Sequence, residues 1–473
     1  MTDITTQLFI NGELRRAKSG KVIAQVNPAT EEIFCEVQSA GPPELENAID
    51  GAQQAFTDSW RDLKPGRRAE ILFQTARLIR DNTEKLAQLE SRNVGKPISD
   101  ARDEVQLGAR VFEYYAGAIS KFYGQTIPVA RGGLDITLRQ PMGVVAAIVP
   151  WNFPFPIACW KAAPALAAGN CVILKPASQS PLTAIMLGVL AHQAGLPPGA
   201  LQIMPGAGSE IGDALVQHPR VRKISFTGST AIGARIMALA APELKRVSLE
   251  LGGKSPNIVF ADCDLEQAAS ASPMNVFANT GQDCCARSRI FVERPVFDAF
   301  VDKFIAAARG LRVGDPSRED TQLGPLISKS QRETVEHFLS STAGTITGGK
   351  RPPLKGYFLQ PAVVTTIEPT ERIWREEVFG PVVCIRPFDD EKQMLAEVNA
   401  SPYGLSASLW TNDLKRALRV ARQVESGVLS INSHSSVHVE APFGGFKQSG
   451  LGRDLGMSAM EGYTELKNIY FGE

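Results

Sequence analysis

The sequence predicts an α/β protein in which parallel strands alternate with helices. Short β-rich apolar runs recur between about 142 and 250 with helical stretches between them, and a second α/β pattern follows from Pro256 to about Asn432. Alternation at this spacing is typical of parallel sheets covered by helices on both faces. The chain has 473 residues, 44% of them hydrophobic, which is enough for two or three domains.

The expected elements can be placed by residue range. Strands of the first pattern are expected at 143–149, 171–174, 201–204, 223–226 and 247–251, with helices at 158–168, 182–194, 210–217 and 230–239. The first ~110 residues begin with β-like segments and turn helical from Pro43 to about Tyr115. Two β-like segments, 123–140 and the C-terminal YTELKNIYF, fit neither sheet, so they could pair with each other or across a subunit interface. The Pro/Gly-rich segment 350–356 predicts a surface loop.

Charge and composition favour a small-molecule partner. Basic and acidic residues number 50 each, which removes a general electrostatic case for nucleic acid or an anionic membrane. No apolar run approaches the roughly 18–20 residues that span a bilayer, and the first residues, MTDITTQLFI, lack the pattern of a signal peptide. Seven cysteines without a CxxC pair argue against a disulfide framework, and cytoplasmic location is the simplest interpretation. The five histidines include no HExxH, so no metal site is expected.

Two glycine-rich segments are candidates for phosphate binding. In the first, which runs from Gly206 to Gly212, the third glycine comes one residue late for GxGxxG, which favours a flexible turn. The second, FTGST at 226–230 followed by Gly233, is more informative because N–H groups at the start of a helix suit a pyrophosphate. Ser229 in this segment could bind phosphate or simply cap the helix.

A thiol and a carboxylate stand out as candidate catalytic groups. Cys284 and Cys285 lie on a loop among small and polar residues, as a reactive thiol requires. Glu250 ends an otherwise apolar strand, so it must pair, stay exposed, or have a raised pKa suited to base catalysis. Pairing with Lys254 or Lys245 remains open. The other cysteines lie in apolar or helical contexts and are interpreted as small buried hydrophobes: Cys35, Cys159, Cys171, Cys263 and Cys384.

Two further strand ends carry polar groups. Asn152, in PWNFP after the first expected strand, supplies an amide able to stabilise an oxyanion. Lys175 ends the next strand, where its ammonium could meet a ribose or a phosphate. An amide, a lysine, a glycine loop and a glutamate thus follow four strands of one expected sheet, at the edge where such sheets bind ligands.

Together these motifs resemble those of the aldehyde dehydrogenase superfamily, from about Leu8 to Phe471. They occur in the family's order: PWNFP at 150–154, KPA at 175–177, FTGST at 226–230, ELGGK at 250–254, GQDC at 281–284, EEVFGP at 376–381 and PFGGFKQSG at 442–450. Cys284 follows Glu250 by 34 residues (284 − 250), as in the hydrolytic, non-acylating members. The resemblance implies a Rossmann-like NAD(P)-binding domain (1–120 and 142–252), a catalytic domain (253–447), and small β segments for oligomerisation (121–141 and 448–473) in a homodimer or homotetramer.

The resemblance also implies a mechanism. Cys284 would attack the aldehyde to form a thiohemiacetal, whose oxyanion the Asn152 amide and the Cys284 N–H would hold. After hydride transfer, Glu250 would activate the water that hydrolyses the thioester. Lys161 and Asp454 match the positions of a proton relay. The implied cofactor contacts are Ile148, Pro150, Trp151, Lys175, Ser178, Gly208, Gly212, Phe226, Gly228, Ser229, Gly233, Leu251, Gly252, Glu377 and Phe379.

Departures from the family pattern bear on cofactor and substrate. Ser178 replaces the glutamate common in NAD-specific members and would not repel a 2′-phosphate, so NADP as well as NAD is expected. Trp160 stands where succinate-semialdehyde members carry arginine, and the segment INSHSSV at 431–437 lacks the aromatic residue usual in betaine and aminoaldehyde members. An uncharged aliphatic or aromatic aldehyde is therefore expected, in a pocket formed by Phe153, Ile157, Trp160, Phe277, Asp283, Cys285, Asn432 and Phe443.

Other activities remain as alternatives. Semialdehyde or aminoaldehyde oxidation would keep the same chemistry with a different pocket. A coenzyme A-acylating dehydrogenase generally lacks the glutamate at the position of Glu250. A cofactor-independent thiol esterase, or a non-catalytic protein that kept the scaffold, would use the motifs only in part.

Overall fold

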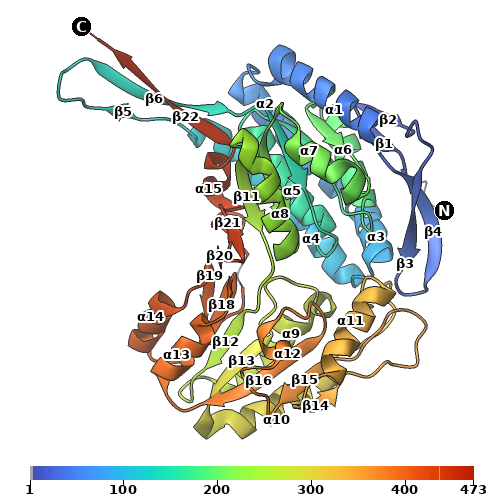
Figure 1. The fold of residues 1–473 in the computed structure, drawn as a ribbon, viewed down its shortest axis with the longest axis vertical. Helices are drawn as coiled ribbons and strands as arrows, with labels where there is room; N and C mark the ends of the chain where they lie inside the picture. Colours follow the sequence, from blue (N-terminus) through green and yellow to red (C-terminus); the bar gives the residue numbers. More distant parts are fainter. Residues whose placement is uncertain (1–3, 436, 473) are drawn as a thin grey trace.

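The computed structural model describes residues 4–435 and 437–472, which form a mixed α/β structure with two large sheets (Figure 1). The first sheet has eight strands in the order β2-β1-β9-β8-β7-β10-β11-β21, and the run from β9 to β11 is parallel. Its strands are β1 (Leu8–Ile10), β2 (Glu13–Arg15), β7 (Val144–Ile148), β8 (Cys171–Lys175), β9 (Leu201–Ile203), β10 (Val221–Thr227), β11 (Arg246–Glu250) and β21 (Gly450–Leu451). The expected parallel sheet is therefore present.

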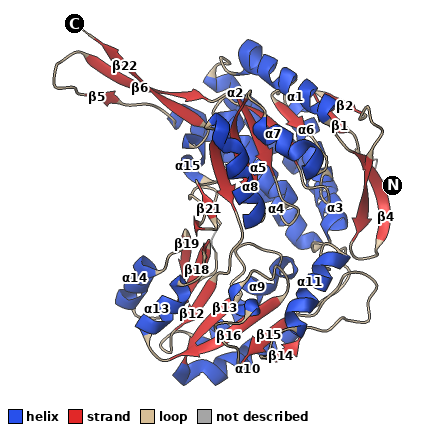
Figure 2. Cartoon of the chain, viewed as in Figure 1, coloured by secondary structure: helices blue, strands red, loops and turns tan. Residues whose placement is uncertain are grey.

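Helices flank this sheet, as Figure 2 shows. They are α1 (Pro42–Ala55), α2 (Pro65–Asp81), α3 (Thr83–Val94), α4 (Ile98–Ala118), α5 (Pro154–Ala167), α6 (Leu182–Gln193), α7 (Asp213–Gln217) and α8 (Thr230–Ala240). Helix α5 begins four residues before the expected range (158 − 154), because Pro154 stands in the first turn, where a missing N–H costs nothing. The segment Gly208–Gly212 forms a π-helical turn before α7, so the expected helix at 210–217 is shorter.

The second sheet has seven strands in the order β14-β15-β16-β13-β12-β18-β19, of which only β14 runs antiparallel to its neighbour. Its strands are β12 (Pro256–Val259), β13 (Arg289–Glu293), β14 (Thr345–Gly348), β15 (Ala362–Thr365), β16 (Val382–Phe388), β18 (Ser406–Trp410) and β19 (Val428–Ile431). The helices are α9 (Leu265–Phe277), α10 (Phe297–Arg309), α11 (Lys329–Ser340), α12 (Arg372–Arg375), α13 (Glu391–Asn399) and α14 (Leu414–Gln423). The second α/β pattern is confirmed.

A three-stranded arm projects from the first half of the molecule (Figure 1). It consists of β5 (Thr126–Ile127), β6 (Leu134–Pro141) and β22 (Thr464–Phe471), which follows α15 (Gly456–Glu461). The two β-like segments that fitted neither sheet pair with each other, from Thr464 opposite Pro141 to Phe471 opposite Leu134. Two small sheets complete the fold: β3 (Val22–Asn27) with β4 (Glu32–Gln38), and β17 (Tyr403–Gly404) with β20 (Phe446–Lys447). Residues 350–356 form a mostly exposed loop, as expected.

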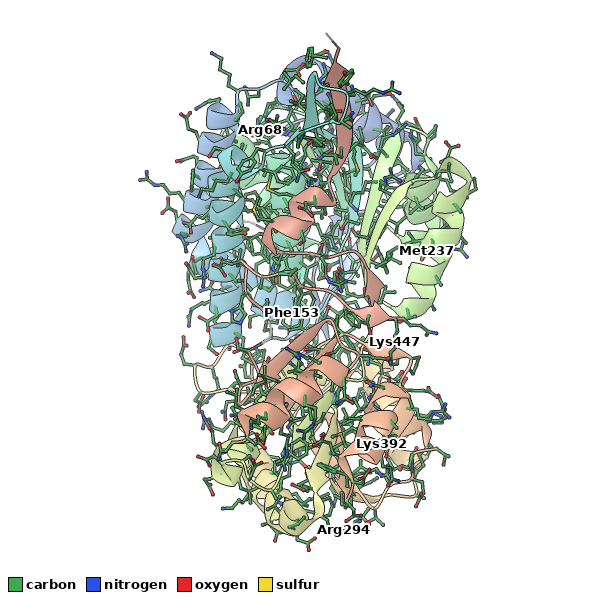
Figure 3. All side chains as sticks on the ribbon, turned by 90° about the vertical axis from the view of Figure 1, so that its left-hand side faces the viewer. Arg68, Phe153, Met237, Arg294, Lys392 and Lys447 are labelled. Atoms are coloured by element: carbon green, nitrogen blue, oxygen red, sulfur yellow. The ribbon has the colours of Figure 1, made fainter. Side chains whose placement is uncertain are left out.

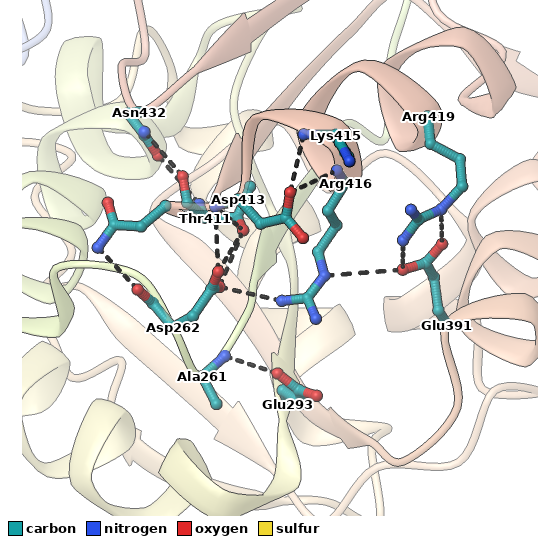
Figure 4. Close-up of polar contacts among 11 residues, drawn as sticks. Ala261, Asp262, Glu293, Glu391, Thr411, Asp413, Lys415, Arg416, Arg419 and Asn432 are labelled. Atoms are coloured by element: carbon teal, nitrogen blue, oxygen red, sulfur yellow. Dashed lines mark hydrogen bonds and ion pairs between the residues drawn. The ribbon is translucent and has the colours of Figure 1, made fainter.

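Polar contacts join strand ends of the second sheet (Figure 4). Asp262, beyond β12, accepts from the Thr411 hydroxyl at 2.8 Å and from Arg416 Nη1 at 3.1 Å. Asn432, beyond β19, exchanges two hydrogen bonds with the Thr411 backbone, at 2.9 and 3.0 Å. The Asn432 amide therefore joins β19 to β18, and these contacts do not place Asn432 in the expected substrate pocket.

Within the described residues, no helix is long and apolar enough to cross a membrane.

Candidate active site

Three loops from distant parts of the chain meet beyond the carboxyl ends of β7 and β11. The Asn152 side chain donates to the Gln282 carbonyl at 2.9 Å, which joins the loop after β7 to the loop that carries Cys284. A Cβ on Gly253 would approach the Cys284 carbonyl oxygen to 2.5 Å, and one on Gly444 would approach Glu250 Oε1 to 2.6 Å. The approach at Gly253 is to a backbone atom, so a side chain there would displace the Cys284 loop. The charge of Cys285 also acts on the Glu250 carboxyl. The structure therefore places Asn152, Glu250 and Cys284 in one region.

The loop before Cys284 has unusual backbone geometry. Asn279 and Thr280 have φ of 51° and 57°, in the left-handed region, where each non-glycine residue costs about 1–3 kcal/mol unless its surroundings hold it. Asn279 Nδ2 donates to the Asn152 carbonyl at 2.9 Å and to the Gln282 carbonyl at 3.2 Å. The Thr280 hydroxyl donates to the Gly324 carbonyl at 2.8 Å. These hydrogen bonds hold the strained segment that precedes Cys284.

The Cys284 thiol is half-buried. Its pKa lies well above the ordinary value, because the neighbouring Cys285 thiol, burial and the Asp283 carboxyl all disfavour the thiolate. Because only a thiolate is strongly nucleophilic, this thiol would have to lose its proton in order to react. Of the cysteines interpreted as small hydrophobes, Cys159, Cys171 and Cys384 are buried, and Cys35 and Cys263 are half-buried.

Glu250 is a buried carboxyl without a partner. It is 4% exposed, and neither of its oxygens accepts a hydrogen bond within the part of the chain that the structure describes. Burial, and next the charge of Asp454, raise the pKa of Glu250 well above its ordinary value. The open alternative of an ion pair is not observed among the described residues, since Lys245 instead donates to the His218 carbonyl and neither carboxyl oxygen of Glu250 has a hydrogen-bonding partner there. The pKa is thus moved toward the range that suits a general base.

The Asn152 backbone is held by residues that the sequence did not single out. Lys96 Nζ donates to the Asn152 carbonyl at 3.0 Å and forms a buried ion pair with Glu104. The Lys96 ammonium also lies 4.2 Å from the centre of the Phe153 ring. Burial raises the pKa of Glu104 to about 8, against the opposing charge of Lys96. Lys96 ends a charged helical stretch, and no local pattern there points to a loop more than fifty residues on (152 − 96).

Lys161 and Asp454, expected to act together, form a buried ion pair. The Lys161 ammonium on α5 lies 2.9 Å from Asp454 Oδ2, and their side chains are 0% and 2% exposed. The charge of Asp454 raises the pKa of Glu250, and the charge of Lys161 lowers it. The pair therefore lies beside the candidate base.

The expected cofactor residues gather along the carboxyl ends of the first sheet. Lys175 ends β8, its side chain bonds only the Pro176 carbonyl at 3.3 Å, and burial lowers its pKa to about 8. Ser229 stands at the start of α8 without a capping hydrogen bond, so its hydroxyl is available to a ligand. The same edge carries the other expected residues: Ile148, Pro150 and Trp151 after β7; Ser178 after β8; Gly208 and Gly212 in the π-helical turn; Phe226, Gly228 and Gly233 around the start of α8; and Leu251 and Gly252 after β11.

Two expected cofactor residues approach from the second half of the chain. Glu377 Oε1 accepts from the Gly253 N–H at 3.1 Å, and burial raises the pKa of Glu377 to about 7. The Phe379 ring lies edge-on to Trp151, with ring centres 5.3 Å apart. The start of α8 at Ser229, the Lys175 ammonium at the end of β8 and the Glu377 carboxyl beside Gly253 are groups that suit a dinucleotide.

Aromatic and apolar side chains of the expected pocket belong to the hydrophobic cluster against which Cys284 packs. Trp160 packs edge-on against Phe443 with ring centres 5.4 Å apart, and both belong to the hydrophobic cluster that Phe153 and Cys284 join. Phe153 lies at the level where the two halves meet (Figure 3). Ile157 and Cys285 are buried in this cluster, and the half-buried Asp283 carboxyl accepts from the Cys285 N–H at 2.8 Å. That these residues line a substrate pocket stays a prediction.

Phe277 is a correction to the expected pocket. It is fully buried at the end of α9, and its ring packs on Phe304 with ring centres 6.0 Å apart, in a separate core cluster of the second sheet. The reason is that α9 turns this face toward α10 rather than toward the loop that carries Cys284.

Comparisons with known proteins agree with this arrangement. The family model described as the aldehyde dehydrogenase family matches residues 15–469. The chain is 42% identical over 472 residues to human retinaldehyde dehydrogenase 3 (98% of this chain, 92% of the relative), and 40% identical over 469 residues to an aldehyde dehydrogenase of Emericella nidulans (98% and 94%). A solved NAD+ complex of an aldehyde dehydrogenase from Bacillus cereus superposes with a TM-score of 0.97 at 40% identity (98% of this chain, 96% of that chain). The chain therefore belongs to the aldehyde dehydrogenase family, a family of NAD(P)-dependent oxidoreductases.

Proposed function

We propose that this protein oxidises an uncharged aliphatic or aromatic aldehyde to the carboxylic acid, with NAD+ or NADP+ and water. The observation that carries this proposal is the meeting of the Cys284 loop, the Asn152 amide and the unpartnered Glu250 carboxyl at one sheet edge. A nucleophile, an oxyanion donor and a base in one buried site are the groups that thioester chemistry requires.

In the first half of the reaction, Cys284 Sγ bonds to the aldehyde carbon and the thiol gives up its proton. The Asn152 amide donates to the oxygen as it becomes negative, while Lys96 and Asn279 hold the Asn152 carbonyl in place. A nicotinamide cofactor held by Lys175, Ser229 and Glu377 would supply the hydride acceptor for this carbon. The acyl group then stays on Cys284 as a thioester.

In the second half, Glu250 takes a proton from a water molecule, and the water oxygen bonds to the acyl carbon. Collapse of the tetrahedral adduct breaks the C–S bond, releases the acid and returns the Cys284 thiolate. The raised pKa of Glu250 makes its carboxylate a stronger base than an exposed glutamate. Release to water rather than to coenzyme A is favoured because the base is present.

The surroundings of Cys284 support an uncharged substrate. Trp160, Phe443 and Ile157 present rings and an alkyl chain, and Trp160 provides no cation for a substrate carboxylate. Two relatives are named for apolar aldehydes: the human retinaldehyde dehydrogenase and an indole-3-acetaldehyde dehydrogenase of P. syringae. An aminoaldehyde is the second candidate, because the half-buried Asp283 carboxyl lies beside the thiol and would attract an ammonium group.

Ser178 supports acceptance of both cofactors. Its hydroxyl is neutral and bonds only weakly, to the Gly206 carbonyl at 3.3 Å, so a ribose 2′-phosphate would meet no negative charge from this side chain. Three of the solved relatives carry NAD+ by their descriptions. We infer that the same sheet edge binds NAD+ here and tolerates NADP+.

A panel of aldehydes with each cofactor tests the function. Reduced cofactor, followed by absorbance, should form with apolar aldehydes and either cofactor, and the product should be the free acid even when coenzyme A is present. Formation of acyl-CoA, ester hydrolysis with no aldehyde-dependent reduction, or no turnover at all would each overturn it. A preference for NAD+ well over 100-fold in kcat/KM would refute the argument from Ser178.

We also propose that residues 121–141 and 448–473 serve assembly into a homodimer or homotetramer, beside a cofactor domain (1–120 and 142–252) and a catalytic domain (253–447). The arm presents exposed apolar side chains that a second copy could cover: Ile127, Leu134, Leu138, Leu466, Tyr470 and Phe471. Light scattering should give a dimer or tetramer for the wild type and a smaller species for Leu466→Glu. A monomeric wild type would refute this role.

A further inference from the structure

Three consecutive residues of the Cys284 loop bring metal-binding atoms close together. A carboxyl oxygen of Asp283 and the Sγ atoms of Cys284 and Cys285 all lie within 4.8 Å of one another. In the part of the chain that the structure describes, no other group of three acidic, cysteine or histidine side chains meets this limit. No histidine belongs to the group, so the spacing of the histidines, from which no metal site was expected, does not bear on it. Thiolates and carboxylates are ligands of zinc and of softer metals.

The spacing of this trio, Asp283, Cys284 and Cys285, fits a tetrahedral ion. Zinc–sulfur bonds of about 2.3 Å at the tetrahedral angle place two sulfur atoms about 3.8 Å apart and a carboxyl oxygen about 3.5 Å from each of them. All three separations lie below the observed limit of 4.8 Å, so small rotations of the side chains bring the three atoms onto one ion. A fourth position is left for water, as in other zinc sites with three protein ligands.

Hydrogen bonds hold the loop that carries the trio. Asp283 Oδ1 accepts from the Cys285 N–H at 2.8 Å, which fixes the direction of the carboxyl. The Ala286 N–H donates to the Asp283 carbonyl at 3.0 Å, and Arg287 Nη1 donates to the Cys285 carbonyl. Because an ordered loop loses little conformational freedom when a ligand binds, these hydrogen bonds favour capture of an ion.

The charges around the thiols favour a cation. After the neighbouring thiol and burial, the charges of Asp283 and Glu377 raise the pKa of Cys284, and the same charges stabilise a positive ion. Arg287 is 2% exposed, and its Nε and Nη2 have no hydrogen-bonding partner among the described residues. Two thiolates, one carboxylate and a divalent cation together carry one negative charge, which the buried Arg287 guanidinium balances.

We propose that Asp283, Cys284 and Cys285 bind a divalent cation that prefers sulfur, such as Zn²⁺, and that the bound ion reversibly blocks the Cys284 thiol. Binding breaks two S–H bonds, forms two metal–sulfur bonds and one metal–oxygen bond, and releases the two thiol protons to solvent. The metal keeps its oxidation state, so no oxidant or reductant takes part. Asp283 and Cys284 are half-buried, so an ion can reach them from solvent. Inhibition of turnover rests on the proposed function of Cys284, whereas binding of the ion does not.

A titration of the chelator-treated, full-length protein with Cd²⁺ tests the site directly, because cadmium–thiolate bonds give an ultraviolet charge-transfer band. The wild type should bind one Cd²⁺ per chain with the band of two thiolates. Cys284→Ser and Cys285→Ser should each show half of that band. Asp283→Asn should keep the full band but bind about 10- to 100-fold more weakly, the loss in affinity that is typical when a metal site loses a supporting group.

Cys263→Ser is the matched control. Cys263 is also a half-buried thiol and lies between Asp262 and Asp264 in the sequence, but it does not belong to the trio. This variant should bind Cd²⁺ as the wild type does.

Turnover at a fixed free concentration of Zn²⁺ tests the inhibition. The wild type and Cys263→Ser should lose most of their activity and recover it when EDTA removes the metal. Cys285→Ser and Asp283→Asn, each compared with its own metal-free rate, should need about tenfold more Zn²⁺ for the same inhibition. Zinc that binds with no loss of wild-type turnover would refute the block of Cys284.

No cadmium band in the wild type, or the band of a single thiolate, would overturn the proposal, since the trio would then not bind as a unit. Wild-type affinity in both Cys285→Ser and Asp283→Asn would also overturn it, as would loss of binding in Cys263→Ser. If Cys285→Ser does not fold, Asp283→Asn decides the outcome, because asparagine keeps the shape of the side chain. Failure of the proposed function is a different result: the metal-free wild type would then reduce no cofactor with any aldehyde, while the cadmium band would be unaffected.

Discussion

The side-chain amide of Asn279 donates to the backbone carbonyl of Asn152 at 2.9 Å, across 127 residues of sequence. The same amide donates to Gln282, so one side chain links the loop of the proposed nucleophile to the loop of the proposed oxyanion donor. Asn279 has a φ of 51°, a conformation that asparagine tolerates better than most residues. The side chain and the backbone conformation of Asn279 thus both hold the Cys284 loop against the Asn152 loop.

Asn279→Gly should lower kcat/KM about 10- to 100-fold, because glycine keeps the left-handed backbone but loses both hydrogen bonds, and small misplacement of reacting groups is costly. Steady-state kinetics with a good aldehyde would measure this. The affinity for cofactor should stay unchanged, which serves as the control. Wild-type kcat/KM in the glycine variant would contradict the role of Asn279 as a positioning residue.

Cys284→Ser should abolish aldehyde-dependent reduction of the cofactor, whereas Cys285→Ser should retain most of it. The reason is that the Cys284 loop packs on Gly253 and is bonded by the Asn152 amide, and that Cys284 is half-buried whereas Cys285 is buried. Mass spectrometry after brief exposure to substrate should find the acyl adduct on Cys284. If Cys285→Ser were the inactive variant, the nucleophile would have been misassigned.

Glu250→Gln should slow hydrolysis of the thioester more than hydride transfer, so stopped-flow absorbance should show a burst followed by slow turnover. The wild-type rate should fall as pH decreases through the raised pKa of Glu250, because only the carboxylate accepts a proton. That dependence should be absent or displaced in Glu250→Gln. A variant with no burst and an unchanged pH profile would exclude Glu250 as the base for hydrolysis.

The affinity for cofactor should weaken as pH rises above about 8, since the pKa of Lys175 is near that value and only the ammonium binds phosphate or donates fully to a ribose. Titration of protein fluorescence with NAD+ from pH 6 to 10 would measure the dissociation constant. Lys175→Met should bind more weakly at pH 7 and lose the dependence on pH. An unchanged dependence in this variant would assign it to another group.

Local patterns predicted much of the fold and of the candidate site. The strands at 144–148, 171–175 and 246–250 follow from apolar β-rich runs, and the motifs at their ends follow from residue type and spacing. The pairing of β6 with β22 was one of two arrangements that the sequence left open. The predicted ends of helices were less accurate. Helix α5, for example, begins at Pro154, earlier than the apolar periodicity suggested.

The sequence by itself determined the α/β class, the order of the motifs and the identity of Cys284, Glu250 and Asn152 as candidates, because these depend on short-range periodicity and spacing. Only the tertiary structure decided which distant side chains meet. It shows that Lys161 contacts Asp454 across 293 residues and that Lys96 and Asn279 donate to the Asn152 carbonyl. It also buries Phe277 in a different hydrophobic cluster, against Phe304. Such contacts arise from the packing of whole helices and sheets, and no local pattern of the chain encodes them.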